Sequence, residues 1–463
     1  MEYQHLHHNT ICALSTPAGG AISVIRVSGE HAIDIVDRLF CKNNGKHLID
    51  AKGYTLHYGQ FNNPAGEVVD DVMVSLYRAP HSYTGEDSIE ISCHGSQYIV
   101  KEVLRSLIET GCRQAEPGEY TMRAYMNGKL DLSQAEAVAN LIASTNKATH
   151  KIAMSQLKGH FSSELADLRE QLLKMTSLLE LELDFSDHED LEFADRSELL
   201  ELAQTIDLRI TQLARSFETG NAIIQGIPVA IVGKTNVGKS TLLNALLHQD
   251  KAIVSDVHGT TRDYIEDTTQ INGITFRFID TAGIRNTDDK VELMGIDRSF
   301  QKIDEASIIL WILDRQPTEM EVDEMKMRTK GKKVIILYNK SDLNASSSQF
   351  FSIFGFQPYA QLAISAKYKT GLDELEKSVY EAADIPVITE NSVIVTSTRH
   401  YEALTRAHTT LLRVIDDLHA NFSGDLIAED LHICLEQLAE ITGGQITTSE
   451  VLENIFKHFC IGK

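Results

Sequence analysis

The stretch VAIVGKTNVGKST, from Val229 to Thr241, decides the fold of the middle of the chain. A β-branched run leads into G-x-x-x-x-G-K-S and then into a helical pattern, which is the strand–loop–helix order of a phosphate-binding loop. Gly233 and Gly238 allow the backbone to turn so that its amides face a phosphate, and the helix N-terminus adds a favourable dipole. We therefore expect Lys239 to reach the β- and γ-phosphates and Ser240 to ligate Mg²⁺.

Two further segments carry residues suited to the metal and the γ-phosphate. FRFIDTAG (276–283) is a predicted strand that ends in Asp280, which is placed to hold Mg²⁺ through water, with Gly283 near the γ-phosphate. GTTRD (259–263) occupies the place of a first switch segment, and Thr261 is its candidate sensor of Mg²⁺ and the γ-phosphate. Both segments predict a nucleoside triphosphate site.

The base is expected to be guanine. VIILYNKSD (334–342) is a strand that ends in N-K-x-D, and the Asp342 carboxylate offers two oxygens to the N–H groups on the guanine edge. Adenine would present a mismatched edge and leave this carboxylate unpaired. LAISAK (362–367) ends a later strand and supplies Ser-Ala-Lys near the base.

Together these segments resemble the GTPase superfamily. This resemblance places the nucleotide contacts on Asn236, Val237, Gly238, Lys239, Ser240, Thr241, Ser255, Thr260, Thr261, Asp280, Thr281, Ala282, Gly283, Asn339, Lys340, Asp342, Ser365, Ala366 and Lys367. One departure matters: Ile284 follows DTAG where Ras-like enzymes carry a water-orienting glutamine. Two residues could take over the glutamine's role. Asn236 is a polar side chain within the P-loop, beside the phosphates. Glu292 is either a carboxylate that comes back to the nucleotide site or a charge on a helix surface, with equal weight for both.

Helical patterns flank this G domain on both sides. A capping box at Ser133 and Glu136 predicts a helix start. The helical pattern continues to about residue 185 with a break at Gly159, covers 198–217, and resumes at about Arg399. The final predicted helix has the buried stripe Val451, Leu452, Ile455, Phe456 and Phe459. Two helical stretches without cores of their own predict one split helical domain into which the G domain is inserted.

The first 120 residues alternate apolar and polar residues between Pro and Gly, which predicts a small α+β domain. Its Arg26 and Glu90, with Lys129 just beyond, are either strand-end charges or holders of a polar ligand. The expected fold class is multidomain α/β: an N-terminal α+β domain, a split all-helical domain, and an inserted Ras-like P-loop G domain with a mostly parallel sheet. The predicted division is 1–120, 121–218, 219–380 (the G domain) and 381–463.

Composition bounds the cellular setting. The chain has 463 residues and a formal net charge of −23, and no long basic run marks a nucleic-acid surface. Six scattered cysteines without a C-x-x-C pair argue against a disulfide framework and a zinc site. No Lys or Arg precedes Arg26, and runs such as SIILWIL are too short to span a bilayer. A cytoplasmic protein without a membrane span is expected.

The whole chain resembles the MnmE (TrmE) family of tRNA modification GTPases. The resemblance is carried by TICALSTPAGGAISVIRVSG, HSYTGEDSIEISCHG and PGEYTMRAYMNGKLDLSQAEAV before the G domain. Within it stand GKTNVGKST, GTTRD, DTAGIR with VELMGI, and NKSD, and the chain ends in CIGK.

The family resemblance implies a folate site. It implies that the N-terminal domain dimerises the protein and binds 5,10-methylene- or 5-formyl-tetrahydrofolate through Arg26, Glu90, Lys129 and Lys463. The helical domain is implied to deliver Cys460 towards this carbon donor. The last residues HFCIGK are then the end of a catalytic arm. The tail taken by itself favours instead a half-buried cysteine in a frayed end after the last helix.

The resemblance also implies how GTP is hydrolysed and for what. Potassium is implied to be held by Asn236, Ser255, Val257 and Thr260, Mg²⁺ by Ser240 and Thr261, and the attacking water by Glu292. The potassium ion takes over the electrostatic work of an arginine finger as G domains dimerise. With FAD-dependent MnmG (GidA), in a heterotetramer or larger complex, the family adds a carboxymethylaminomethyl or aminomethyl group to C5 of the wobble uridine of certain tRNAs.

A ribosome-assembly or RNA-chaperone GTPase is the competing interpretation. Such a protein shares the G-domain motifs but needs neither a folate pocket nor a terminal Cys-x-Gly-Lys. Folate binding to residues 1–120 separates the two.

Overall fold

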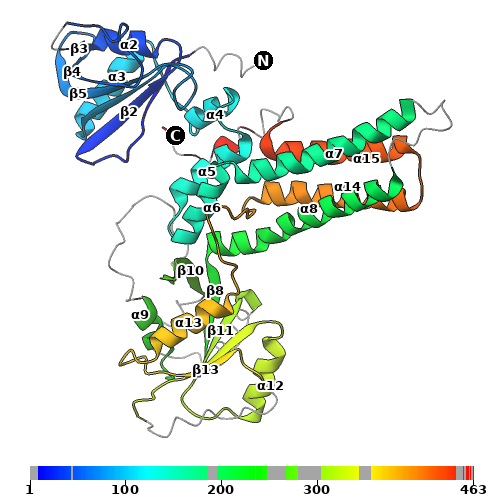
Figure 1. Ribbon diagram of the computed structural model, residues 1–463. Helices are drawn as coiled ribbons and strands as arrows, with labels where there is room; N and C mark the ends of the chain where they lie inside the picture. The colour runs from blue at the N-terminus through cyan, green and yellow to red at the C-terminus, as the bar shows by residue number, and fades with distance from the viewer. Residues whose placement is uncertain are drawn as a thin grey trace. The chain divides into compact units, whose positions relative to one another are not determined.

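The computed structural model describes residues 9–42, 45–184, 195–234, 236–247, 267–279, 304–343, 356–444, 452, 455–457, 459 and 462 (Figure 1). Its contacts divide the chain into two units. The first consists of Met1–Ala143, Ala153–Ile210 and Glu402–Lys463, and the second of Ser144–Ile152 and Thr211–Tyr401. The predicted four-segment division stays a prediction.

The first unit contains a seven-stranded sheet in the order β3-β4-β5-β6-β2-β1-β7. The strands are β1 (Ile11–Leu14), β2 (Ile22–Ser28), β3 (Phe40–Lys42), β4 (Thr55–Asn62), β5 (Val68–Tyr77), β6 (Ser88–His94) and β7 (Arg113–Gln114). Neighbouring strands are antiparallel except β1 and β7, which are parallel.

One face of this sheet is buried beneath α2 (Ala32–Leu39) and α3 (Gln97–Thr110). Alternate residues of each strand, such as Ile25 on β2 and Ile91 on β6, join these helices in one hydrophobic core. Since successive side chains of a strand point to opposite faces, Arg26 and Glu90 lie on the other face.

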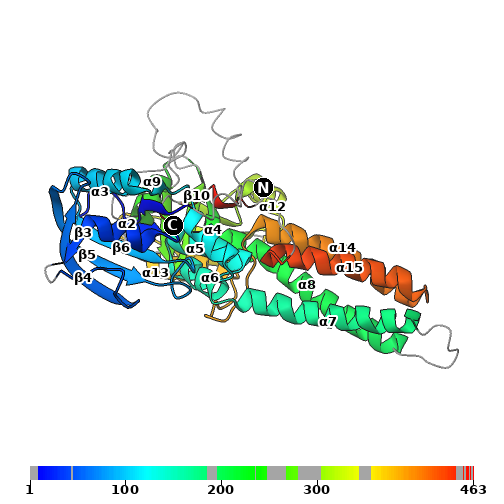
Figure 2. The ribbon, with the colours of Figure 1, turned by 90° about the horizontal axis from the view of Figure 1, so that it is seen from above.

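The helices of the first unit follow the sheet in the chain. They are α4 (Glu119–Met126), α5 (Leu132–Ala143), α7 (His160–Asp184), α15 (Gly424–Thr442), the first half of α8 (Arg196–Gln225) and all but the first turn of α14 (Thr398–His419). Helices α7, α8, α14 and α15 lie side by side (Figures 1 and 2). Gly159, with φ of +83°, separates α7 from α6 (Lys147–Leu157), so the predicted break is confirmed.

The predicted capping box before α5 is wrong in its residues. The reciprocal hydrogen bonds join Asp131 and Gln134, at 2.9 Å each, whereas the Ser133 hydroxyl contacts Ser162. Asp131, which lies two residues before the predicted cap Ser133, therefore accepts a hydrogen bond from the backbone N–H of Gln134 in the first turn of α5. The stripe predicted for the final helix is confirmed for its described members: Leu452 and Phe456 are buried, and Ile455 and Phe459 pack against them.

The second unit is built on a six-stranded sheet in the order β13-β12-β11-β8-β10-β9. Its strands are β8 (Ile227–Val232), β9 (Asp267–Ile271), β10 (Ile274–Ile279), β11 (Ile308–Leu313), β12 (Lys333–Tyr338) and β13 (Ala360–Ala363). All pairs are parallel except β9 with β10. The described helices beside it are α9 (Lys239–Leu247), α12 (Glu319–Arg328) and α13 (Leu372–Ala382).

The parallel sheet confirms the predicted G-domain fold. β8 and β11 are central and apolar, and residues from both of their faces enter hydrophobic cores, as expected for a sheet covered on both sides. The predicted phosphate-binding loop therefore leaves the carboxyl end of a central strand, where ligands bind in open α/β sheets. Among the described residues, no helix combines the length and hydrophobicity needed to cross a membrane.

Candidate functional site

The loop between β8 and α9 is shaped by close backbone approaches. A side chain at Gly233 would place Cβ 2.6 Å from the carbonyl oxygen of Ile312 on β11. At Gly238, which has φ of +101°, Cβ would lie 2.2 Å from Nδ2 of Asn339. Both positions therefore require glycine, and α9 begins directly after the second one.

Asn339 connects the phosphate side of this site to the base side. Its Nδ2 donates a 2.7 Å hydrogen bond to the carbonyl of Val237, and its Oδ1 accepts a 3.0 Å bond from the backbone N–H of Ala366. Asn339 is 9% exposed, so both bonds form away from bulk water. One side chain thus holds the P-loop, the N-K-x-D segment and the Ser-Ala-Lys segment together.

The base-reading side chains are arranged around Asp342. The hydroxyl of Ser365 donates a 2.6 Å hydrogen bond to Asp342 Oδ1, which fixes the carboxylate while its residue stays exposed. Lys340, in the left-handed region at φ of +64°, forms a 2.9 Å ion pair with Asp314 at the end of β11. Lys367 is exposed next to Ala366.

Lysine side chains in the P-loop are held by internal partners. Lys239 Nζ donates to the carbonyls of Gly233, at 2.6 Å, and of Lys234, at 2.7 Å. Burial lowers the pKa of Lys239 because the charged ammonium loses solvation. Lys234 forms an ion pair with Glu321, whose other oxygen accepts from the backbone of Thr318 in the capping box of α12.

Three more of the predicted nucleotide-site residues lie in or beside the loop between β8 and α9. Ser240 lies in the first turn of α9, Thr241 is exposed beside it, and Asn236 is exposed in the loop at φ of +62°. The other predicted nucleotide, metal and catalytic residues lie outside the described residues: Ser255, Val257, Thr260, Thr261, Asp280, Thr281, Ala282, Gly283 and Glu292. Among described residues, no cluster of three or more His, Cys, Asp or Glu suits a metal ion.

A second polar site lies on the open face of the seven-stranded sheet. Arg26 on β2 is the cross-strand partner of Glu90 on β6. Its Nη2 and Nε donate to one carboxylate oxygen of Glu90, at 2.8 and 3.1 Å. The ion pair leaves both predicted roles open, strand-end charges or holders of a polar ligand. Cys460 and Lys463 lie outside the described residues.

Two tyrosine rings enclose the Arg26 guanidinium. Its central carbon lies 5.4 Å from the ring centroid of Tyr83 and 5.5 Å from that of Tyr120. The Tyr120 hydroxyl donates a 2.8 Å hydrogen bond to the carbonyl of Arg26, and Tyr83 is hydrogen-bonded to Thr121 at 2.9 Å. Burial raises the pKa of both tyrosines, so both remain neutral hydrogen-bonding groups at neutral pH.

Lys129 belongs to the same neighbourhood through the loop that carries Tyr83. Its Nζ donates a 3.1 Å hydrogen bond to the carbonyl of Pro80, and its stem passes Gly85. Asn127 donates to the carbonyl of Thr84 at 2.7 Å. The loop between β5 and β6 is therefore fastened to the segment after α4.

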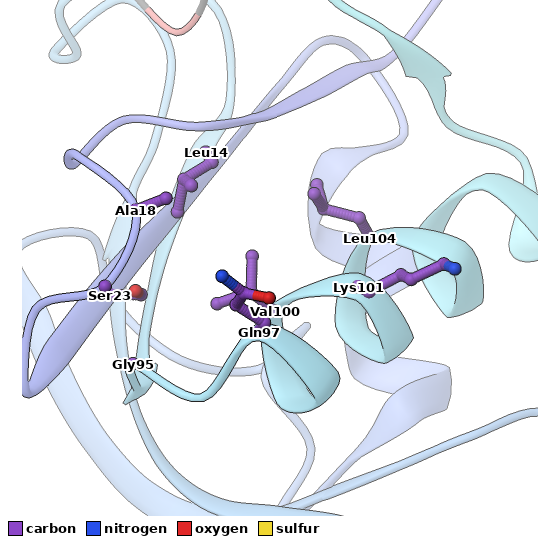
Figure 3. A pocket seen from close by; sticks show the side chains of 9 residues that line it. Leu14, Ala18, Ser23, Gly95, Gln97, Val100, Lys101 and Leu104 are labelled. Carbon is purple, nitrogen blue, oxygen red and sulfur yellow. The ribbon is translucent and has the colours of Figure 1, made fainter. Parts of the chain in front are cut away.

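A cavity of about 250 Å³ lies elsewhere in this domain, between the β1–β2 connection and α3 (Figure 3). Its lining is mostly apolar, with polar groups on Ser23, Gln97 and Lys101. Ser23 and Arg26 are an odd number of residues apart on β2, so they face opposite sides of the sheet. The cavity is thus separate from the Arg26–Glu90 pair.

Sequence reasoning missed several partners in both sites. Tyr83 and Tyr120 stand in quoted segments, HSYTGED and PGEYT, but their positions over Arg26 depend on strand pairing and on α4. Asp314 and Glu321 were missed because no motif marks them. Asp314 directly follows β11, whereas Glu321 lies in the first turn of α12.

Comparisons with known proteins cover the whole chain. The family model described as MnmE helical domain matches residues 132–460, and the one described as GTP-binding protein TrmE N-terminus matches residues 10–129. A tRNA modification GTPase MnmE of Phocaeicola vulgatus is 52% identical over 99% of this chain and 99% of its own. The protein of the same name from Parabacteroides distasonis is 55% identical over 98% of this chain and 100% of its own.

One solved structure is similar to about a third of the chain. The FeoB G-domain from Methanococcus jannaschii is 25% identical, with 34% of this chain and 98% of that chain covered and a TM-score of 0.25. The assignment rests instead on the family models and the full-length relatives. The chain therefore belongs to the MnmE (TrmE) family of tRNA modification GTPases.

Proposed function

We propose that this chain is the potassium-dependent, GTP-hydrolysing subunit of a complex that modifies C5 of the wobble uridine in tRNA with a folate-derived carbon. The proposal assigns GTP to the second unit and a tetrahydrofolate to the open face of the N-terminal sheet. The potassium ion, the folate carbon donor and the modified atom, C5 of the wobble uridine, are all parts of this proposal.

At the nucleotide site, the P-loop amides and Lys239 bind the phosphates, and Asp342 accepts from the guanine edge. The Lys239 ammonium has three N–H donors, of which two bind the carbonyls of Gly233 and Lys234, so a phosphate would give this desolvated cation a charge partner. Glu292 orients water, and Ser240 and Thr261 hold Mg²⁺. Bound K⁺ and Mg²⁺ supply positive charge at the oxygens where charge develops.

At the folate site, Glu90 and Arg26 present a carboxylate and a guanidinium side by side. This combination suits a ligand that carries both donor and acceptor groups on one flat edge, and the neighbouring tyrosine rings suit its flat face. Lys129 and Lys463 provide cations for the ligand's carboxylates, and Cys460 acts at the carbon donor. The bound folate supplies the one-carbon unit.

The observation that carries this proposal is the Arg26–Glu90 pair, with the rings of Tyr83 and Tyr120 at the Arg26 guanidinium. The side chains of Arg26 and Glu90 are 19% and 29% exposed, and two tyrosine rings lie at the Arg26 guanidinium. A GTP-dependent switch alone does not require such a site. These side chains do suit recognition of a polar, flat ligand.

The same sheet face supports a homodimer. Leu56 is joined to Arg26 by a row of cross-strand partners, Leu56–Ser75–Glu90–Arg26, so all four share one face. Leu56 is 59% exposed and Tyr58, two residues on, is 54% exposed. A second copy would cover these side chains.

A flavoprotein partner, MnmG, is proposed to carry most of the tRNA affinity because this chain has a net charge of −23. Tight, salt-dependent tRNA binding by this chain alone, equal to that of the complex, would contradict this division of labour.

The test is calorimetric titration of the full-length chain with 5-formyl-tetrahydrofolate. We expect saturable binding by the wild type, at least a tenfold loss in Arg26→Ala, and no change in Arg105→Ala. Arg105 is the matched control because it pairs with Glu102 at 2.6 Å on the exposed side of α3. Absence of saturable binding, or equal affinity in Arg26→Ala, would contradict the proposal and favour a G-domain switch without folate chemistry.

A further inference from the structure

Helix α4 contacts Gly443, at the C-terminal end of α15, and the C-terminal segment, by which we mean the described residues 452, 455–457, 459 and 462. Near the end of α4, the Tyr125 hydroxyl donates a 3.1 Å hydrogen bond to the carbonyl of Gly443. In its middle, Met122 shares a buried cluster with Leu452 and Phe456. The helix therefore lies against the chain's own C-terminus along its length.

The C-terminal segment approaches the backbone closely at Gly118, the N-cap of α4. Gly118 has φ of +68°, and a Cβ there would lie 2.8 Å from the carbonyl oxygen of Phe456 and 2.9 Å from Cβ of Phe459. A carbonyl oxygen and a Cβ belong to or adjoin the backbone, so they cannot rotate away as the end of a flexible side chain can. Gly118 is thus needed both for its backbone conformation and for its lack of a side chain.

The other end of the C-terminal segment lies against β1. The hydroxyl of Ser15 donates a 3.2 Å hydrogen bond to the carbonyl of Gly462. Gly462 is buried, has φ of +92°, and a Cβ there would lie 2.4 Å from the carbonyl oxygen of Leu14. The segment is therefore seated at both Gly118 and Ser15.

Both contacts are next to groups that hold Arg26. Ala13, two residues before Ser15, is the cross-strand partner of Arg26 in the β1–β2 pair. Tyr120, two residues after Gly118, places its hydroxyl on the Arg26 carbonyl and its ring over the guanidinium. Seating of the C-terminal segment and the position of Arg26 thus depend on the same strand and the same helical turn.

We propose that Ser15 and Gly118 are positioning residues that seat the C-terminal segment beside the Arg26–Glu90 pair for the tRNA-modifying reaction. The inference rests on the proposed function, in which the end of the chain works at the folate site. Neither residue touches substrate: each acts through the segment that it holds. We call the two residues the tail seat.

Two pairs of variants separate the tail seat from general stability. Gly118→Ala adds a Cβ against Phe456, while Gly66→Ala, at φ of +84° with nothing within 4 Å, imposes comparable backbone strain without a collision. Ser15→Ala removes the hydroxyl that binds Gly462, and Ser15→Thr retains it. The Ser15 pair keeps the test valid if Gly118→Ala fails to fold.

The first measurement is hydrogen exchange of the C-terminal peptide in full-length protein, which requires no folate, tRNA or partner. We expect exchange at least tenfold faster than wild type in Gly118→Ala and Ser15→Ala, and wild-type exchange in Gly66→Ala and Ser15→Thr. Equal exchange in Gly118→Ala and Gly66→Ala, with equal exchange in the two Ser15 variants, would overturn the tail seat.

The second measurement is the C5-modified wobble nucleoside in a deletion strain that carries each variant, together with the GTPase rate of the purified proteins. We expect modification to fall at least fivefold in Gly118→Ala and Ser15→Ala, to be restored by Ser15→Thr, and GTPase rates to stay within twofold. If a variant shows fast exchange of the C-terminal peptide but full tRNA modification, the role of the tail seat in the reaction is overturned while the proposed function stands. If wild type and Gly66→Ala also failed to restore modification, the proposed function would fail, while the exchange data would still decide the seat.

Discussion

The side-chain amide of Asn339 donates a 2.7 Å hydrogen bond to the carbonyl of Val237, which lies 102 residues earlier in the chain. The same side chain accepts from Ala366 N–H, so the phosphate loop and both base-side loops are connected through one buried group. The nucleotide site is therefore assembled by contacts of the protein itself.

Asp342→Asn is expected to change base preference from guanine to xanthine. The carboxylate can accept from two guanine N–H groups, and hydrogen bonds to charged groups contribute about 1.5–3 kcal/mol each, so GTP affinity should fall roughly 10²- to 10⁴-fold. The amide of asparagine can instead donate to the extra carbonyl of xanthine. Competition between GTP and XTP for a fluorescent nucleotide measures this, with Asp373→Asn on the exposed start of α13 as control. Unchanged GTP affinity in Asp342→Asn would remove Asp342 from base recognition.

Replacement of K⁺ by Na⁺ is expected to slow GTP hydrolysis by at least tenfold. The proposed cation takes the electrostatic role of an arginine finger, which is worth about 10³- to 10⁵-fold in other GTPases. Asn236→Ala should remove most of the difference between the two salts, because Asn236 is a proposed ligand in an exposed loop position. Steady-state phosphate release at matched ionic strength checks both. Equal rates in K⁺ and Na⁺ for the wild type would rule out the potassium role.

Glu119→Gln is expected to destabilise the first unit and to flatten its acid response. Glu119 is 1% exposed and accepts hydrogen bonds from Arg113 and Arg123. Burial acts to raise its pKa, but these arginines and the backbone N–H of Glu116 outweigh burial, so the pKa lies below its ordinary 4.5. Breaking such a buried pair costs about 3–5 kcal/mol.

The sign of the pH dependence follows from the lowered pKa. The folded carboxyl holds its proton less tightly than the unfolded one, so its contribution is complete above about pH 4.5 and is lost as the pH falls through the folded pKa. The stability gap between wild type and Glu119→Gln should therefore narrow below pH 4.5 in urea unfolding. Glu116→Gln, at an exposed neighbour, is the control. A gap that stays constant down to pH 3 would contradict this account of Glu119.

The G domain was predictable from the sequence because its chemistry is local. A β-branched strand, a glycine loop and a helix start within thirteen residues specify the P-loop, and the parallel sheet follows from the alternation of strands and helices. The contacts of Asn339 and Lys340 were not predictable, because Val237 and Asp314 come from other strand ends.

The N-terminal site shows the opposite balance. Arg26 and Glu90 were singled out, but residue patterns left their role open, since only the pairing of β2 with β6 makes them partners. The positions of the Tyr83 and Tyr120 rings near Arg26 were not predictable, because Tyr83 lies in a loop and Tyr120 in a helix from another part of the chain.

One helix start was assigned to the wrong residues although its signal was present. The cap of α5 was predicted at Ser133, whereas Asp131 and Gln134 fit the same spacing and form the reciprocal hydrogen bonds. Local preference alone does not rank two such neighbouring alternatives.

The central claim is that the chain's terminal cysteine takes part in wobble-uridine modification, and one measurement tests it most directly. A strain that lacks this chain would carry either the wild-type copy or Cys460→Ser, and its tRNA nucleosides would be quantified by mass spectrometry, with GTPase rates measured in parallel. We predict that wild type restores the C5-modified wobble nucleoside and that Cys460→Ser does not, at an equal GTPase rate. Full restoration by Cys460→Ser would contradict the account and leave the terminal cysteine with a structural role.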